Sequence, residues 1–154
     1  MKKSGMAFLA LAALALSMGA CENTSGASDV SLVEWTSSFG FCPPTAYCTT
    51  RLRVTGALAV VTRESRESPT VSNSVRLSAA EADALARAAE QARFQGLDPV
   101  IGCPDCADGG AETLSVTAEG EQRTVTFEFN APVDKLEPLL GQVRGLVARL
   151  RPMP

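Results

Sequence analysis

Two short runs of alternating apolar and polar residues, separated by the turn Glu119-Gly120, constrain the fold of this chain most strongly. The apolar members are Leu114, Val116 and Ala118 before the turn, and Val125, Phe127 and Phe129 after it. Successive side chains of a strand point to opposite faces of a sheet, so this pattern predicts a hairpin. Each of its strands should bury one face and expose the other to water.

Two helices are predicted from different signals. Ser78-Ala-Ala-Glu81 has the spacing of a capping box, the Ala-rich residues 79–93 favour a helix, and Gly96 suits a C-terminal cap. The second helix covers about Val133 to Leu150, with Pro138 in or near its first turn. Its apolar residues recur three or four positions apart, as on one face of a helix; they are Leu136, Leu139, Leu140, Val143, Leu146, Val147 and Leu150.

Further strands are expected earlier in the chain. Ser31–Phe41 reads as a first strand running into a loop, and Val71–Leu77 as a later one. Thr49–Val54 and Ala57–Thr62 either form a hairpin that turns at Thr55-Gly56 or make one long strand with a bulge at Gly56. Together these elements predict an α+β fold, with an antiparallel sheet of about five to six strands and two helices packed on one face.

The N-terminal segment has the layout of an export signal. Lys2 and Lys3 precede the apolar run 6–16, and the small residues Gly19 and Ala20 stand directly before Cys21. The apolar run is shorter than the roughly 20 residues that a helix needs to cross a bilayer. Cleavage before the cysteine would leave it at the new N-terminus. An ordinary secretory signal, cleaved nearby and carrying no lipid, is the alternative.

This layout resembles the signal of bacterial lipoprotein precursors, although Met18 stands where that family usually has Leu. The resemblance implies that residues 1–20 are removed and that Cys21 carries a covalent lipid. Residues 21–30 then form a flexible tether and residues 31–154 a single domain. Glu22, in place of the Asp that retains some lipoproteins at the inner membrane, favours the outer membrane of the cell envelope, on its periplasmic or surface face.

The mature part also resembles small exported bacterial domains of unknown function. The likeness rests on Phe41–Cys48 followed by Arg51–Gly56, on the Ser-capped helix, on an Asp-bearing loop, and on a hairpin before a terminal helix. It covers most of residues 31–150 and implies no activity.

Four further cysteines, Cys42, Cys48, Cys103 and Cys106, form an even set, for which disulfides are expected in an exported protein. Three connectivities are open. Pairing of Cys42 with Cys48 and of Cys103 with Cys106 is favoured by proximity. Pairing between the two clusters would close longer loops and stabilise the fold more.

Cys103-Pro104-Asp105-Cys106 also has the spacing of thiol oxidoreductases, but the acidic Asp105 and Asp108 oppose thiolate formation. A zinc site of four cysteines could be drawn from the same residues, although an oxidising compartment disfavours it. Asp105, Asp108 and Glu112 are weak candidates for calcium, because their spacing does not match the EF-hand loop. We therefore expect no metal and no cofactor besides the lipid.

Composition excludes several function classes. The net charge is −3 for the whole chain, and loss of Lys2 and Lys3 with the signal makes it −5, which argues against nucleic-acid binding. The chain has no histidine, so Ser-His-Asp and Cys-His catalysis and histidine-ligated zinc are excluded. Hydrolysis by paired carboxylates stays open, but a chain with one Trp and one Tyr offers few aromatic sugar platforms.

These observations favour a non-catalytic envelope lipoprotein over an enzyme. It would act as a binding, structural or inhibitory module that meets the membrane through its lipid and an envelope protein or ligand through its sheet or cysteine loops. The alternative is a thiol-redox or metal-binding protein centred on Cys103–Cys106.

Overall fold

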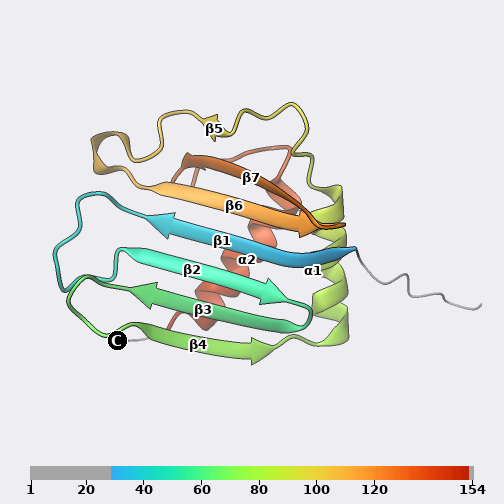
Figure 1. The fold of residues 1–154 in the computed structure, drawn as a ribbon, viewed down its shortest axis with the longest axis horizontal. Helices are drawn as coiled ribbons and strands as arrows, with labels where there is room; N and C mark the ends of the chain where they lie inside the picture. Colours follow the sequence, from blue (N-terminus) through green and yellow to red (C-terminus); the bar gives the residue numbers. More distant parts are fainter. Residues whose placement is uncertain (1–28, 153–154) are drawn as a thin grey trace, which may run out of the picture.

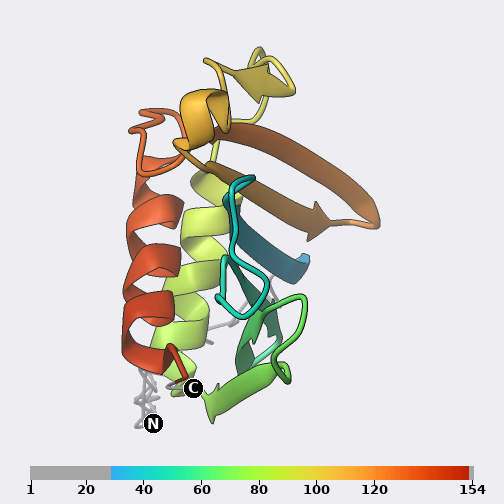
Figure 2. The same ribbon diagram turned by 90° about the vertical axis from the view of Figure 1, so that its left-hand side faces the viewer.

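The computed structural model describes residues 29–152, arranged as one seven-stranded sheet with two helices on one of its faces (Figure 1, Figure 2). The strands are β1 (Val30–Ser38), β2 (Thr49–Thr55), β3 (Leu58–Glu64), β4 (Val71–Arg76), β5 (Val100–Ile101), β6 (Ala111–Ala118) and β7 (Glu121–Glu128). The helices are α1 (Ala79–Gln91) and α2 (Glu137–Leu150). The order in the sheet is β4-β3-β2-β1-β6-β7-β5.

The predicted α+β class and the placement of both helices on one face are confirmed. The predicted signal 1–20 and the predicted lipidation site Cys21 lie outside the described residues. Within residues 29–152, neither helix combines the length and the apolar character that spanning a membrane requires.

Both predicted hairpins form, and the turn of the second one suits the backbone. Between β6 and β7, Ala118 pairs with Glu121, so Glu119 and Gly120 make a two-residue turn with φ of 53° and 80°. Positive φ at both positions matches the twist of the flanking strands. Between β2 and β3, Thr55 pairs with Leu58, which shifts the predicted turn by one residue and shows that the single bulged strand is wrong.

The sheet has one strand more than the upper predicted number, and it is not wholly antiparallel. The added strand is β5, whose Val100 and Ile101 pair in parallel with Thr126 and Phe127 of β7. Two residues are too few to show an alternating pattern, so only the neighbouring strand identifies them. The other strand pairs are antiparallel.

Helix α1 begins as the capping box predicts. The Glu81 backbone N–H donates to Ser78 Oγ at 3.3 Å, and the Ser78 N–H donates to Glu81 Oε2 at 2.9 Å. Its predicted end at Gly96 is wrong, because the helix stops at Gln91 and Ala92 is already extended. The extended backbone buries Ala92 and Phe94 on the same side, which a helix could not do at this spacing.

Helix α2 begins at Glu137 rather than at the predicted Val133, with Pro138 in its first turn. Val133 and Leu136 belong instead to a turn, closed by the Leu136 N–H donating to the Val133 carbonyl at 2.7 Å. Both side chains are buried. Buried apolar residues therefore continue at helical spacing into the turn that precedes α2. This is why the predicted helix began too early.

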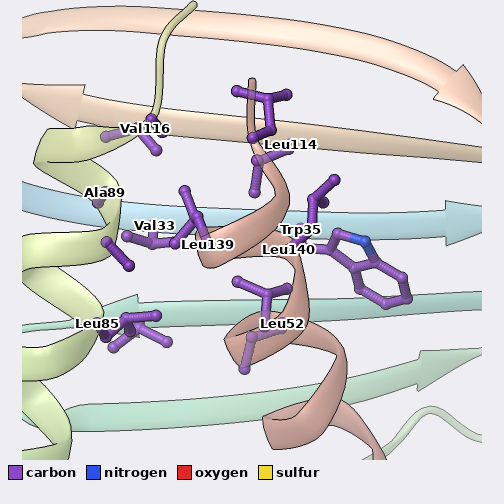
Figure 3. Packing of buried hydrophobic residues seen from close by; sticks show 14 of the residues in the cluster. Val33, Trp35, Leu52, Leu85, Ala89, Leu114, Val116, Leu139 and Leu140 are labelled. Carbon is purple, nitrogen blue, oxygen red and sulfur yellow. The ribbon is translucent and has the colours of Figure 1, made fainter. Parts of the chain in front are cut away.

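The core lies between the helices and the sheet face that they cover. Figure 3 shows side chains of β1, β2 and β6 directed toward α1 and α2, with Leu139 of α2 near Val33 and Leu140 near Trp35. Ala88 and Ala89 of α1 are buried, so small side chains let this helix approach β1. The largest fully buried apolar side chains are Phe127, Leu52, Leu114, Leu136, Leu139, Leu140, Val61 and Val143.

Truncating this core should cost far more than truncating the open face. Leu140 is 0% exposed and Leu58 is 45% exposed. We expect Leu140→Ala to lower the free energy of unfolding by about 2–5 kcal/mol, and Leu58→Ala to lower it by less than about 1 kcal/mol. Urea unfolding followed by circular dichroism measures both. Equal losses would contradict the assignment of the covered face.

The ion pair between the two helices should make stability depend on pH. The hydrogen bond from Arg149, together with those from Ser78, lowers the pKa of Glu81 to about 2. A carboxyl whose pKa is depressed in the folded state stabilises that state above its unfolded pKa of about 4.3. This contribution is lost as the pH falls toward 2.

The stability difference between the native protein and Glu81→Gln should therefore shrink between about pH 5 and pH 2. Chemical unfolding across this range measures it. In an Arg149→Gln background the same comparison should change less with pH, because the main cause of the low pKa is gone. An unchanged pH dependence in that background would assign the effect to another group.

Candidate functional site

A pocket of about 420 Å³ opens between α2 and the end of the sheet where β1 ends and β6 begins, the end that faces the viewer in Figure 2. Its walls combine apolar side chains with a few polar and charged groups. The lining residues are Trp35, Ser37, Phe39, Tyr47, Cys48, Thr50, Glu112, Phe129, Asn130, Arg144, Val147, Ala148 and Arg151.

Glu112 is the fully buried carboxylate of this pocket. Its Oε2 accepts a hydrogen bond from Trp35 Nε1 at 2.8 Å and lies 3.2 Å from Nε and 3.1 Å from Nη2 of Arg144. Its Oε1 accepts from the Asn130 backbone N–H at 3.0 Å. A charge removed from water must be paired and hydrogen-bonded, and Glu112 is both.

The strand register brings these groups together. Ser37 of β1 pairs with Glu112 of β6, and Trp35 pairs with Leu114, so these positions share the face that the helices cover. The Arg144 side chain extends from α2 to Glu112. Its Nη2 also donates to the carbonyl of Ala131, in the loop before α2, at 3.0 Å. The glutamate therefore joins the sheet to the helix and to the loop before it.

An aromatic pair forms one side of the pocket. The rings of Phe39 and Phe129 meet edge to face, with their centroids 4.8 Å apart. Gly110 passes directly behind Phe39 with a φ of +86°, and a β-carbon there would overlap the Phe39 ring. Both the positive φ and the close approach require glycine at this position.

The Cys42–Cys48 disulfide closes the loop that forms another wall. The two Cα atoms are 5.9 Å apart, and the predicted local pairing is confirmed here. Tyr47 and Cys48 line the pocket. The loop is held to the β3–β4 connection by Ser65 Oγ donating to the Pro44 carbonyl at 2.8 Å and by Tyr47 Oη donating to the Pro69 carbonyl at 2.7 Å.

Cys103 and Cys106 also pair with each other, with their Cα atoms 5.5 Å apart, and both are exposed. The Asp105 carboxylate between them accepts hydrogen bonds from the backbone N–H groups of Gly40 at 3.0 Å and Gly110 at 3.1 Å. This loop does not line the pocket, but it is attached to the segment that carries Phe39.

The three calcium candidates do not come together. The oxygens of Glu112 are occupied by the donors described above, and Asp105 Oδ1 accepts from two backbone N–H groups. Asp108 is exposed at the end of a short 3₁₀ turn, Cys106–Asp108. Within residues 29–152, no group of three or more acidic or cysteine side chains is arranged to hold a metal ion.

Two further guanidinium groups lie near the pocket. Arg151 lines it, and Arg63 lies beside it, with its guanidinium 5.0 Å from the Tyr47 ring centroid and its Nη1 donating to the Pro152 carbonyl at 3.2 Å. Burial and the neighbouring charge of Arg151 lower the pKa of Arg63, which Tyr47 partly offsets. Among the described residues, neither side chain pairs with a carboxylate.

The sequence pattern predicts Glu112 only as a weak calcium ligand and does not connect it with Trp35 or Arg144. A usable signal was present. Glu112 is in phase with Leu114 and Val116 in an alternating strand, and an acid in a buried register position needs a buried cationic or hydrogen-bonding partner.

No protein-family model matches the chain, and the search of curated proteins found no significant match. The candidate site therefore rests on the geometry and chemistry of the pocket.

Removing the charge of Glu112 should destabilise the domain strongly. Glu112→Gln would leave the Arg144 guanidinium, whose side chain is only 25% exposed, without its buried carboxylate partner, so that only the more exposed Glu137 at 3.8 Å would remain paired with it. We expect a loss of about 3 kcal/mol in the free energy of unfolding. The fluorescence of Trp35, the single tryptophan of the chain, should shift with the change in its hydrogen bond. Glu90→Gln on the exposed surface of α1 is the control, and an equal loss there would contradict the role of Glu112.

Proposed function

We propose that this protein is a non-catalytic binding module of the cell envelope, anchored through a lipid on Cys21, and that the pocket beside Trp35 and Glu112 is its ligand site. The pocket volume of about 420 Å³ supports this proposal most directly. Small-molecule sites usually measure about 300–1,000 Å³ and combine apolar walls with a few convergent polar groups, as this one does.

The arrangement of Glu112 supports binding rather than catalysis. Both of its oxygens already accept hydrogen bonds from Trp35, Arg144 and Asn130, so the carboxylate is held as an acceptor. A general base must instead reach a proton on a substrate. The chain has no histidine to take that role. Glu112 then acts as a positioning residue that holds the pocket walls.

The position of the pocket suits display on a membrane. The tether would join the domain at Val30, where β1 begins, and the pocket includes Ser37 and Phe39 at the other end of this strand. At about 3.3 Å per residue, the pocket lies roughly 25 Å along β1 from the tether. The ligand site would then be turned away from the attachment point.

A thiol-redox activity of Cys103-Pro104-Asp105-Cys106 is the second candidate, because both cysteines of this disulfide are exposed. Thiol titration of the native protein, with and without mild reductant, separates the two candidates. Release of two reactive thiols by mild reductant, abolished when Cys103 and Cys106 are both replaced by Ser, would favour redox chemistry. Four cysteines that stay unreactive would favour the binding module.

The anchor is tested by substitution of the acylated residue. Cys21→Ser should move the protein from the membrane fraction to the soluble fraction, because the lipid attachment atom is lost. Met18→Leu, which restores the residue usual in lipoprotein signals, is the matched control and should leave the protein in the membrane fraction. Mass spectrometry of the purified protein checks for the lipid. Membrane association of Cys21→Ser would overturn the anchor.

A further inference from the structure

We infer that the pocket takes a small organic anion, with its charged group near Arg151 and its apolar or aromatic body between α2 and the aromatic side chains. This inference rests on the proposed function, since it names the ligand class of the same pocket.

The charges at the pocket favour an anion. Arg144 is paired with the carboxylates of Glu112 and Glu137, whereas neither Arg151 nor the adjacent Arg63 pairs with a carboxylate within the described residues. Arg151 and Arg63 also repel each other. An anionic group at this place would relieve that repulsion and could accept charge-assisted hydrogen bonds from Arg151. The excess is local, because the chain as a whole has a net charge of −3.

The same residues disfavour a cation. Glu112 is the carboxylate that lines the pocket, and the donors from Trp35, Arg144 and Asn130 occupy its oxygens. A bound ammonium group would have to displace these donors while it lay close to Arg151. Both effects cost free energy.

The remaining lining residues favour a ligand that has an apolar part besides its charged group. Trp35, Phe39, Phe129 and Val147 contribute ring and aliphatic surface to the walls. Aromatic side chains bind ring systems by stacking and edge-to-face contact. The volume lies in the lower part of the small-molecule range, so a compact molecule fits better than a peptide segment or a lipid with several chains.

The test uses the full chain with Cys21→Ser and three probes. Naphthalene-2-carboxylate has both a negative charge and an aromatic ring system. The second probe, 2-naphthylmethylammonium, has the same ring system with a positive charge, and acetate has the negative charge without the ring system. Isothermal titration calorimetry measures the three dissociation constants. We expect naphthalene-2-carboxylate to bind at least about tenfold more tightly than either of the other probes.

Variants then locate the binding. Arg151→Gln should weaken naphthalene-2-carboxylate by about fivefold to tenfold. Arg87→Gln, an arginine exposed on α1 and absent from the pocket lining, is the matched control and should change the affinity by less than about twofold. Ala148→Trp, which fills the pocket from the exposed side of α2, should abolish the binding.

The outcomes separate the two proposals. The ammonium probe could bind more tightly than naphthalene-2-carboxylate, and Ala148→Trp could abolish this binding. That result would overturn the inference that the ligand is an anion, but it would keep the pocket as the ligand site. Unchanged affinity of naphthalene-2-carboxylate in Arg151→Gln would overturn the placement of the charged group at Arg151. If none of the probes binds at millimolar concentration, or if Ala148→Trp leaves binding intact, the inference fails and the pocket loses its support as the ligand site. Circular dichroism of each variant verifies that it is folded.

Discussion

The buried carboxylate of Glu112 is the interaction on which the arrangement of this domain depends. It connects Trp35 on the central strand, Arg144 on α2 and the backbone of Asn130 in the loop between sheet and helix. Apolar packing alone tolerates sliding of a helix on a sheet, because it has little direction. A charge with several donors defines one position of α2, since any displacement leaves a buried group without its partner.

The two disulfides act at the same end of the sheet. Cys42–Cys48 closes a loop that lines the pocket, and Cys103–Cys106 lies in a loop that Asp105 attaches to Gly40. The loops are far apart in sequence, and the antiparallel pairing of β1 with β6 brings them together. The function that we propose for the pocket therefore depends on segments that stabilise the fold as well as shape the site.

Local signals were sufficient for much of the fold. The capping box at Ser78, the turn at Glu119-Gly120 and the alternation in β6 each depend on residues close in sequence, and each was predictable. The start of α2, the edge strand β5 and the partners of Glu112 depend on what lies opposite them in space. Sequence could place an acid in a buried register position, but the cation that balances it comes from a helix 32 residues further along.

Strand β1 has a mechanical consequence. It lies between β2 and β6 in the middle of the sheet, and in our proposal the membrane tether joins one of its ends while the ligand site lies at the other. The hydrogen bonds of antiparallel strands run perpendicular to the strand direction. A force that pulls the pocket end of the domain away from the membrane would load the two ladders of β1 in shear, so that many bonds resist together rather than opening one after another.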